Sequence, residues 1–278
     1  MIVWKQSGQK TLGRKGCRTE GNSRKIICFK AKRFFSGLGL FALATAVLFI
    51  MREVGMYAVN AFSSARSLPI YSVEKEEKIA AISFDCAWGT EHTDAILREL
   101  DRAGVKAPFF MVEFWPEKYP EYVKNIDEAG HEIGSHSKTH PHMNGLSEAQ
   151  IREELSSSAA AIENVTGKKA ELFRPPFGEY NNLVIDTAKD MGLYPVQWDV
   201  DSLDWKDLSA QDIALRIING TQPGSIILCH NNGLHTAEAL PMIFSALQNK
   251  GYTFVPIGEL IYRENYTIDA AGKQHPAA

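Results

Sequence analysis

Between residues 79 and 255, short apolar runs alternate with amphipathic segments long enough to form helices. An apolar run of four to eight residues is typical of a buried strand, and a repeat near 3.6 residues is typical of a helix with one buried face. Strands alternating with helices indicate a parallel sheet, either doubly wound or closed as a barrel. The predicted strands are 79–84, 107–112, 131–135, 171–174, 194–200, 225–229 and 252–255, and the predicted helices are 93–103, 119–129, 147–165, 182–191, 211–219 and 238–250.

Local signals mark the ends of several predicted helices. Ser147 is followed three residues later by Gln150, which is the pattern of a capping box at a helix N-terminus. Glycine is favoured just after a helix, because it adopts the left-handed conformation without steric cost. The glycines expected at helix ends are Gly104, Gly130, Gly192 and Gly251.

Residues 34–51 form an uncharged, mostly apolar run of 18 residues. At about 1.5 Å per residue this run covers roughly 27 Å, which is close to the thickness of a bilayer's hydrocarbon core. Residues 1–33 hold ten Lys or Arg and one acid, whereas the rest of the chain holds 20 basic and 32 acidic residues. Because basic flanks stay in the cytoplasm, we expect a single-pass transmembrane signal anchor at 34–51 with an extracytoplasmic domain after it.

A cleaved signal peptide is the alternative, with small residues at 59–61 or 63–65 available for cleavage. The basic segment 1–33 is long for a cleaved signal peptide, which favours an uncleaved anchor that stays in the cell membrane. We interpret 1–33 as a basic cytoplasmic arm that contacts anionic lipid rather than nucleic acid. Residues 52–77 are expected to be a stalk, 78–262 the main domain and 263–278 a C-terminal tail.

Polar residues follow five of the predicted strands at the point where each strand ends. The carboxyl ends of parallel strands meet at one edge, so carboxylates, imidazoles and a guanidinium should converge there. Each residue also has a structural interpretation: aspartates cap helices or form turns, Arg174 pairs with an acid, and Trp205 lies in the core. The clusters are Asp85-Cys86, His136 to His140, Arg174 to Gly178, Asp201 to Trp205 and Leu228 to His230.

The order of these clusters resembles that of the polysaccharide deacetylases of carbohydrate esterase family 4, the NodB-homology domain. The resemblance covers about residues 78–262. The matching motifs are SFD at 83–85, HSKTH at 136–140, RPPFG at 174–178, DSLDW at 201–205 and LCH at 228–230. It implies a distorted (β/α)7 barrel that removes N-acetyl groups from amino-sugar polymers with a divalent metal, zinc in most members. Ala87-Trp88-Gly89 and the single span look most similar to the sporulation-associated branch.

The resemblance also implies a role for each matching residue. The metal would be bound by His136 and His140, and Asp85 would be the general base. His230 would be the general acid. The remaining roles are support of Asp85 by Arg174, support of His230 by Asp204, and an acetyl pocket made by Phe177, Trp205 and Leu228.

Cys86 stands where the family's second Asp supplies a third metal ligand. A thiolate binds zinc well, so Cys86 is a candidate third metal ligand. The competing interpretation is that Cys86 is a small apolar residue of the core. Glu91 or Asp94 could replace the missing carboxylate. A Cys86–Cys229 disulfide is a further alternative for the exported domain, although two cysteines are too few for a disulfide scaffold.

The sequence therefore predicts a membrane-anchored, metal-dependent polysaccharide N-deacetylase that acts on a cell-wall glycan. The expected glycan is peptidoglycan, a related spore-wall polymer or a chitin-like oligomer. One alternative is a catalytically degenerate barrel that binds glycan without cleaving it, and another is an O-acetyl esterase using the same site. Trp115, in the segment 113–119, is a candidate for stacking on a sugar or for packing in the core.

Overall fold

The computed structural model describes residues 45–47, 49, 51 and 66–277. The chain divides into two compact units, Met1–Ala65 and Arg66–Ala278. The predicted arm, most of the predicted span at 34–51 and the first part of the predicted stalk lie outside the described residues. Among the residues that are described, no helix has the length and hydropathy needed to cross a bilayer.

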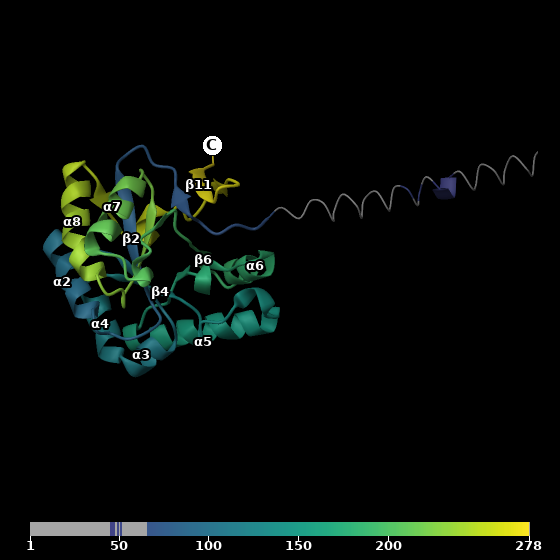
Figure 1. The fold of residues 1–278 in the computed structure, drawn as a ribbon. Coiled ribbons are helices and arrows are strands. Elements are labelled where there is room, and N and C mark those ends of the chain that lie inside the picture. The colour runs from purple at the N-terminus through teal and green to yellow at the C-terminus, as the bar shows by residue number, and fades with distance from the viewer. Residues whose placement is uncertain (1–44, 48, 50, 52–65, 278) are drawn as a thin grey trace, which may run out of the picture. The chain divides into compact units, whose positions relative to one another are not determined.

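The larger unit is built on an eight-stranded parallel sheet (Figure 1). The order of its strands is β6-β5-β4-β3-β2-β8-β7, and β9 pairs with the first two residues of β2. Parallel pairing confirms the expected βα alternation. The bounds are β2 Ile79–Cys86, β3 Pro108–Met111, β4 Glu132–Ser135, β5 Leu172–Phe173, β6 Tyr194–Pro195, β7 Val200–Asp201, β8 Ile226–His230 and β9 Thr253–Phe254.

The predicted strand at 194–200 is broken into two, and the break explains the distorted barrel. β6 pairs with β5 at one edge of the sheet, whereas β7 pairs with β8 at the other edge. Because only residues 196–199 separate β6 from β7, this segment joins the two edges and closes the sheet on itself. The closure agrees with the expected distorted (β/α) barrel.

Alternation along β2 separates two apolar layers. Ile82, Phe84 and Cys86 belong to the outer layer beneath the helices, and Ala81 belongs to the inner cluster within the barrel. Successive side chains of a strand point to opposite faces, so Asp85 shares the inner face. β2 runs two residues beyond its predicted end at 84, which keeps this alternation intact through Cys86.

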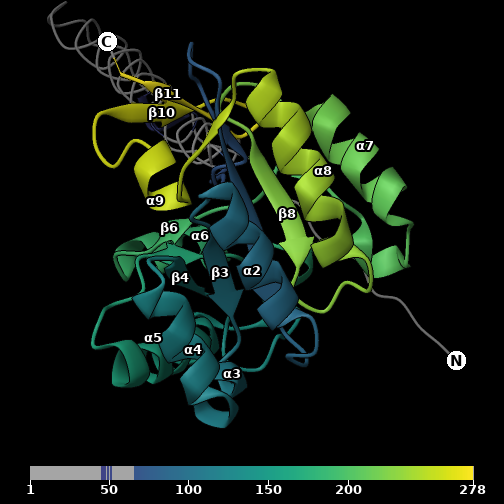
Figure 2. The same cartoon turned by 90° about the vertical axis from the view of Figure 1, so that its left-hand side faces the viewer.

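The helices cover the outer face, and α2 lies beside α8 over the central strands (Figure 2). Most predicted helices are confirmed within one or two residues, and the capping box of Ser147 and Gln150 is present. The short helices α3 and α9 were not expected. The bounds are α2 Thr93–Ala103, α3 Phe114–Lys118, α4 Pro120–Glu128, α5 Glu148–Thr166, α6 Asn182–Asp190, α7 Ala210–Gly220, α8 Thr236–Asn249 and α9 Ile257–Leu260.

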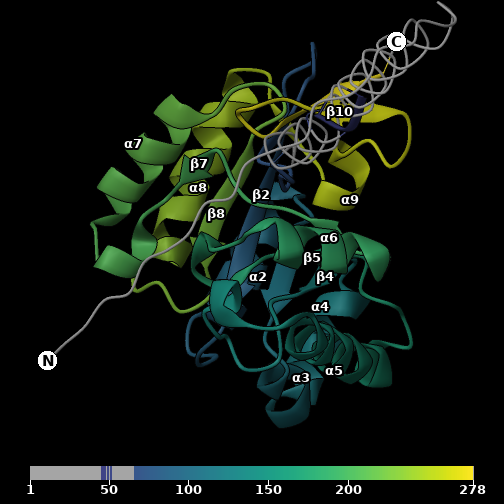
Figure 3. The same ribbon diagram turned by 90° about the vertical axis from the view of Figure 1, so that its right-hand side faces the viewer.

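A second, three-stranded sheet changes the expected domain limits. It pairs β1 (Ser72–Val73) with β11 (Lys273–Pro276), which pairs in turn with β10 (Tyr266–Ile268). Figure 2 shows β10 and β11 side by side, and Figure 3 shows β10 from the opposite side of the molecule. Ile70 and Val73 are buried in the inner cluster. Residues 66–77 bury apolar side chains, and residues 263–277 complete the sheet and bury Gln274, so both segments are part of the compact unit instead of forming a free stalk and tail.

Candidate active site

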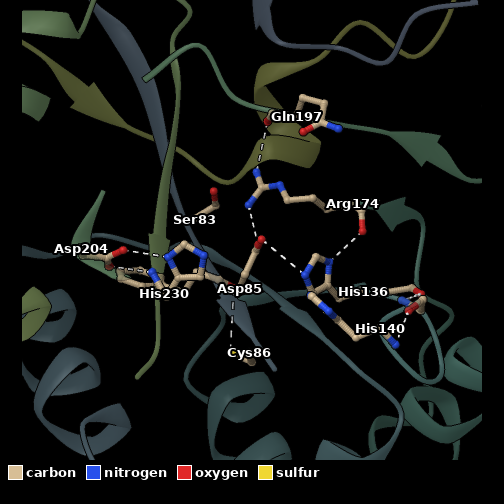
Figure 4. Close-up of polar contacts among 12 residues, drawn as sticks. Ser83, Asp85, Cys86, His136, His140, Arg174, Gln197, Asp204 and His230 are labelled. Carbon is tan, nitrogen blue, oxygen red and sulfur yellow. Dashed lines mark hydrogen bonds and ion pairs between the residues drawn. The ribbon is translucent and has the colours of Figure 1, made fainter. Parts of the chain in front are cut away.

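The predicted polar clusters come together at the carboxyl ends of the parallel strands (Figure 4). The pairing of β2 with β8 sets Asp85 opposite His230. His136 directly follows β4, and Arg174 directly follows β5. The expected convergence of carboxylates, imidazoles and a guanidinium is thus confirmed.

Asp85 and Arg174 form a buried ion pair at the centre of the site. The Arg174 guanidinium donates to Asp85 Oδ1 at 2.8 Å and to the Gln197 carbonyl at 3.2 Å, and it lies over the Phe110 ring at 4.1 Å. Burial alone would raise the pKa of Asp85, but the charge of Arg174, followed by the charges of His136 and His230, outweighs burial and lowers it. Asp85 is therefore held as a carboxylate.

His136 and His140 lie next to this pair, with ring centroids 4.9 Å apart. His136 Nδ1 donates to the Arg174 carbonyl at 2.7 Å, and its Nε2 faces Asp85 Oδ2 at 3.5 Å. Burial lowers the pKa of His136, and burial is also the main cause that lowers the pKa of His140 to about 4. Both imidazoles are therefore neutral at pH 7, which is the form that binds metals.

The loop between these two histidines is fixed by a carboxylate from α5. Glu154 accepts hydrogen bonds from the backbone N–H groups of Lys138 and Thr139, at 2.9 and 2.8 Å, and from the Thr139 hydroxyl at 2.8 Å. His140 has a φ of 57°, in the left-handed region that costs energy for a side-chain-bearing residue. Glu154 therefore stabilises a strained conformation that brings His140 to His136, and sequence reasoning did not find it.

A divalent metal, implied by the sequence resemblance, fits two of these side chains. The neutral rings of His136 and His140 are suitable donors, but among the described residues no group of three or more His, Cys, Asp or Glu side chains is placed to hold a metal. Cys86 is buried in the outer apolar layer, and burial, followed by the charge of Asp85, raises the pKa of its thiol well above its ordinary value. The structure thus supplies two imidazoles and keeps Cys86 as a neutral thiol.

The alternatives proposed for the third ligand are not supported by the described residues. Asp94 accepts a hydrogen bond from the Tyr122 hydroxyl at 3.3 Å, and the Glu91 carboxylate lies against Gly89. Cys86 and Cys229 are both free and buried, so the alternative of a disulfide between them is wrong.

His230, which is partly exposed, and Asp204, which is fully buried, form the second pair of the site. His230 Nδ1 donates to Asp204 Oδ1 at 2.7 Å, and Asp204 Oδ2 accepts from the His230 backbone N–H at 2.8 Å and the Thr236 hydroxyl at 2.6 Å. Burial lowers the pKa of His230, but its hydrogen bond to Asp204 and the charge of that carboxylate raise it more, so the net shift is upward. The hydroxyl of Thr236, at the start of α8, is a support that the sequence did not reveal.

The predicted pocket residues divide into buried and exposed ones. Leu228 is 3% exposed and pairs with Ser83, so it lies on the inner face two residues before His230. Phe177 and Trp205 are 56% and 58% exposed. Trp88, absent from the predicted site, is 60% exposed, and its ring centroid lies 6.4 Å from that of His140. Its position three residues after Asp85 is a sequence signal that was not used to place it in the site.

Comparison with known sequences agrees with this geometry. A family model described as polysaccharide deacetylase matches residues 72–196. The chain is 32% identical over 196 residues to a peptidoglycan-N-acetylglucosamine deacetylase of Bacillus cereus, an alignment that covers 69% of this chain and 92% of that protein. It is 34% identical over 212 residues to the deacetylase PgdA of Listeria monocytogenes, covering 76% of this chain but 44% of PgdA. The chain thus spans less than two thirds of some curated relatives that it matches.

Comparison with solved structures finds both active and inactive proteins of similar fold. The structure matches a Bacillus anthracis protein described as a pseudoenzyme of carbohydrate esterase family 4, with a TM-score of 0.68 and 32% identity, covering 75% of this chain and 73% of that one. A mutant of that protein, described as having restored enzymatic activity, matches with the same TM-score and 35% identity, covering 70% of this chain and 71% of that one.

Proposed function

The chain belongs to the polysaccharide deacetylase family, and from that premise we propose that it hydrolyses N-acetyl groups on amino sugars of a cell-wall glycan. Peptidoglycan or a related spore-wall polymer is the proposed substrate, because relatives are named as peptidoglycan N-acetylglucosamine and N-acetylmuramic acid deacetylases. A carbon-nitrogen bond other than a peptide bond would be cleaved, releasing acetate and a free amine.

The observation that carries this proposal is the pair of oppositely tuned acid and base groups. Arg174 lowers the pKa of Asp85, and Asp204 raises the pKa of His230. A carboxylate that stays ionised can take a proton, and an imidazolium that stays charged can give one. Two titratable groups whose surroundings push their pKa values apart are what general acid–base hydrolysis requires.

The residues then divide the reaction between them. Asp85 would take a proton from a water molecule while the oxygen of that water attacks the acetyl carbonyl carbon. Arg174 would keep the Asp85 carboxylate ionised and correctly oriented. The backbone N–H of Phe177 is assigned to the developing oxyanion. His230 would then protonate the sugar nitrogen as the carbon-nitrogen bond breaks, with Asp204 holding its ring. Trp205 and Leu228 would enclose the acetyl methyl group.

We assign a divalent metal, zinc, to His136 and His140. When bound, it would polarise the acetyl carbonyl and lower the pKa of a bound water. Support comes from the two neutral imidazoles and from Glu154, which fixes the loop between them.

Acetate release tests the activity and its metal requirement. The full chain, purified in detergent, should release acetate from N-acetylglucosamine oligomers and from peptidoglycan. Chelation should abolish release and added zinc should restore it, because two protein ligands hold metal less tightly than three. An O-acetylated sugar in the same assay separates amide hydrolysis from esterase activity. Release that chelator leaves untouched would contradict the metal assignment.

A second candidate function is glycan binding without cleavage. It is favoured by the burial of Cys86 in the apolar layer, which leaves the two histidines without a third protein ligand among the described residues, and by the likeness to a Bacillus anthracis pseudoenzyme. Folded protein that binds glycan oligomers but releases no acetate with any divalent metal would select this function over hydrolysis.

We also propose that residues 34–51 anchor the chain in the cell membrane with the domain outside the cytoplasm. The supporting observations are the uncharged run and the change from a basic arm to an acidic domain. Protease added to intact cells should digest an epitope at the C-terminus and spare one at the N-terminus. If the protein is instead found in the culture medium, in a form shortened at its N-terminus, a cleaved signal peptide is indicated.

A further inference from the structure

Three large aromatic side chains are exposed around the candidate site. Trp88, Phe177 and Trp205 are each more than half exposed, although aromatic rings are among the most costly side chains to leave in water. Trp88 and Phe177 both contact His140, with ring centroids 6.4 and 4.4 Å away. Exposed apolar surface that continues directly from a polar site indicates a surface kept open for a ligand.

The indole of Trp88 is supported on one side. It stacks on the Phe114 ring with a centroid distance of 5.8 Å and an interplanar angle of 28°. Phe114 begins α3, whose next residue, Trp115, is fully buried in the outer apolar layer. Trp88 is therefore backed by a ring that is itself anchored in the core.

The loop that carries Trp88 is also held in place. Asn231, at the end of β8, donates to the Gly89 carbonyl at 2.9 Å, and its backbone N–H donates to the Asp85 carbonyl at 3.1 Å. Gly89 has a φ of 63°, so the turn after Trp88 uses a conformation that favours glycine. The ring is thus presented by a fixed turn rather than by a free loop.

The ring of Phe177 is supported on one face in the same way as the indole of Trp88. Its ring stacks on His142 at 4.4 Å with an interplanar angle of 15°, and it meets the edge of His140. His140 is therefore in contact with two supported aromatic surfaces, one from the loop after β2 and one from the segment after β5. A single aromatic ring can stack on one sugar. Two aromatic surfaces that both contact His140 can contact two neighbouring sugars of one glycan chain.

We propose that Trp88, backed by Phe114, binds the pyranose ring next to the sugar whose acetyl group enters the site, so that the protein recognises a run of amino sugars. This inference rests on the proposed function, whether the chain cleaves the glycan or only binds it. Flat aromatic surfaces suit the C–H face of a pyranose, because the ring buries apolar C–H groups while its hydroxyls stay in water. Trp88 would thus set the chain length that is recognised.

Binding of N-acetylglucosamine oligomers of one to six units, measured by calorimetry on the full chain, tests this assignment. Affinity of the wild type should rise at least about tenfold from monomer to trimer, and Trp88→Ala should remove most of that gain, measured as the ratio of trimer to monomer affinity within each protein. Trp88→Phe should keep part of the gain. Leu215→Ala is the matched control, because Leu215 is 56% exposed on α7 and carries none of these contacts.

The two ways of failing are distinguishable. Length-dependent binding that Trp88→Ala leaves intact, in a variant with an unchanged thermal unfolding midpoint, would overturn the role of Trp88 alone. A wild-type chain that binds no oligomer of any length and releases no acetate would overturn the proposed function, and the inference with it.

Discussion

Asp85→Ala is expected to lower the free energy of unfolding by about 3–5 kcal/mol, in addition to abolishing acetate release. The reason is the partner that is left behind. Arg174 is fully buried and donates to Asp85 Oδ1 at 2.8 Å, so removing the carboxylate leaves an uncompensated cation inside the barrel. Urea unfolding of the full chain, followed by tryptophan fluorescence, measures the change.

A double variant separates the stability effect from the chemistry. Asp85→Leu combined with Arg174→Met replaces both charges by apolar groups, and such replacements of buried pairs are often neutral or stabilising. The double variant should therefore recover much of the stability that Asp85→Ala loses, yet remain inactive. Glu153→Ala, which breaks the exposed ion pair with Lys138, is the control and should leave the unfolding midpoint nearly unchanged.

The pair also gives stability a defined dependence on pH. The pKa of Asp85 is lowered from its ordinary 3.8, so the pair's contribution is complete above that pH and is lost as pH falls through the lower pKa of the folded state. The stability difference between wild type and Asp85→Ala should shrink only in strong acid. An equal difference at every acidic pH, or one that is absent at pH 7, would show that the carboxylate does not stabilise Arg174.

The alternation of apolar runs predicted a parallel α/β sheet, because the spacing of apolar residues differs between strands and helices. It left a doubly wound sheet and a barrel open, and the barrel was implied by the family resemblance. The alternation missed the small sheet of β1, β10 and β11, whose strands are two to four residues long and hold few buried apolar residues. It also missed the break in the strand at 194–200. That break depends on barrel closure, since its two halves pair with strands far apart in the sequence.

The site was predicted wherever a residue stood at a strand end, because strand direction alone places those residues at one edge. Cys86 is the instructive exception. The predicted strand stopped at 84, which left the direction of Cys86 open, whereas the real strand continues to Cys86 and alternation turns it into the outer layer. Trp115 was left open between stacking on a sugar and packing in the core, and the structure selects packing, because α3, which was not predicted, buries its side chain.

Asp204→Asn should reduce acetate release by about 10²–10⁴-fold and move the alkaline limit of the pH–rate profile to lower pH. Asp204 contributes a hydrogen bond and a negative charge to His230, and these raise its pKa above 6.5 despite burial. An asparagine of the same shape removes the charge, so His230 loses its proton at lower pH. Fewer molecules then carry the acid form that protonates the leaving amine.

Two measurements check this mechanism without depending on each other. The first is kcat/KM for acetate release across pH, and the second is the titration of the His230 ring by NMR, which applies even to a chain that only binds glycan. The stabilising contribution of His230 is complete below pH 6.5 and is lost as pH rises through its higher folded-state pKa, so the variant should be less stable mainly at neutral and acid pH. Glu238→Gln, which alters the exposed pair with His235, should leave both profiles unchanged. An unshifted His230 titration in Asp204→Asn would mean that burial and the other charges of the site, not Asp204, set the proton affinity of the proposed acid.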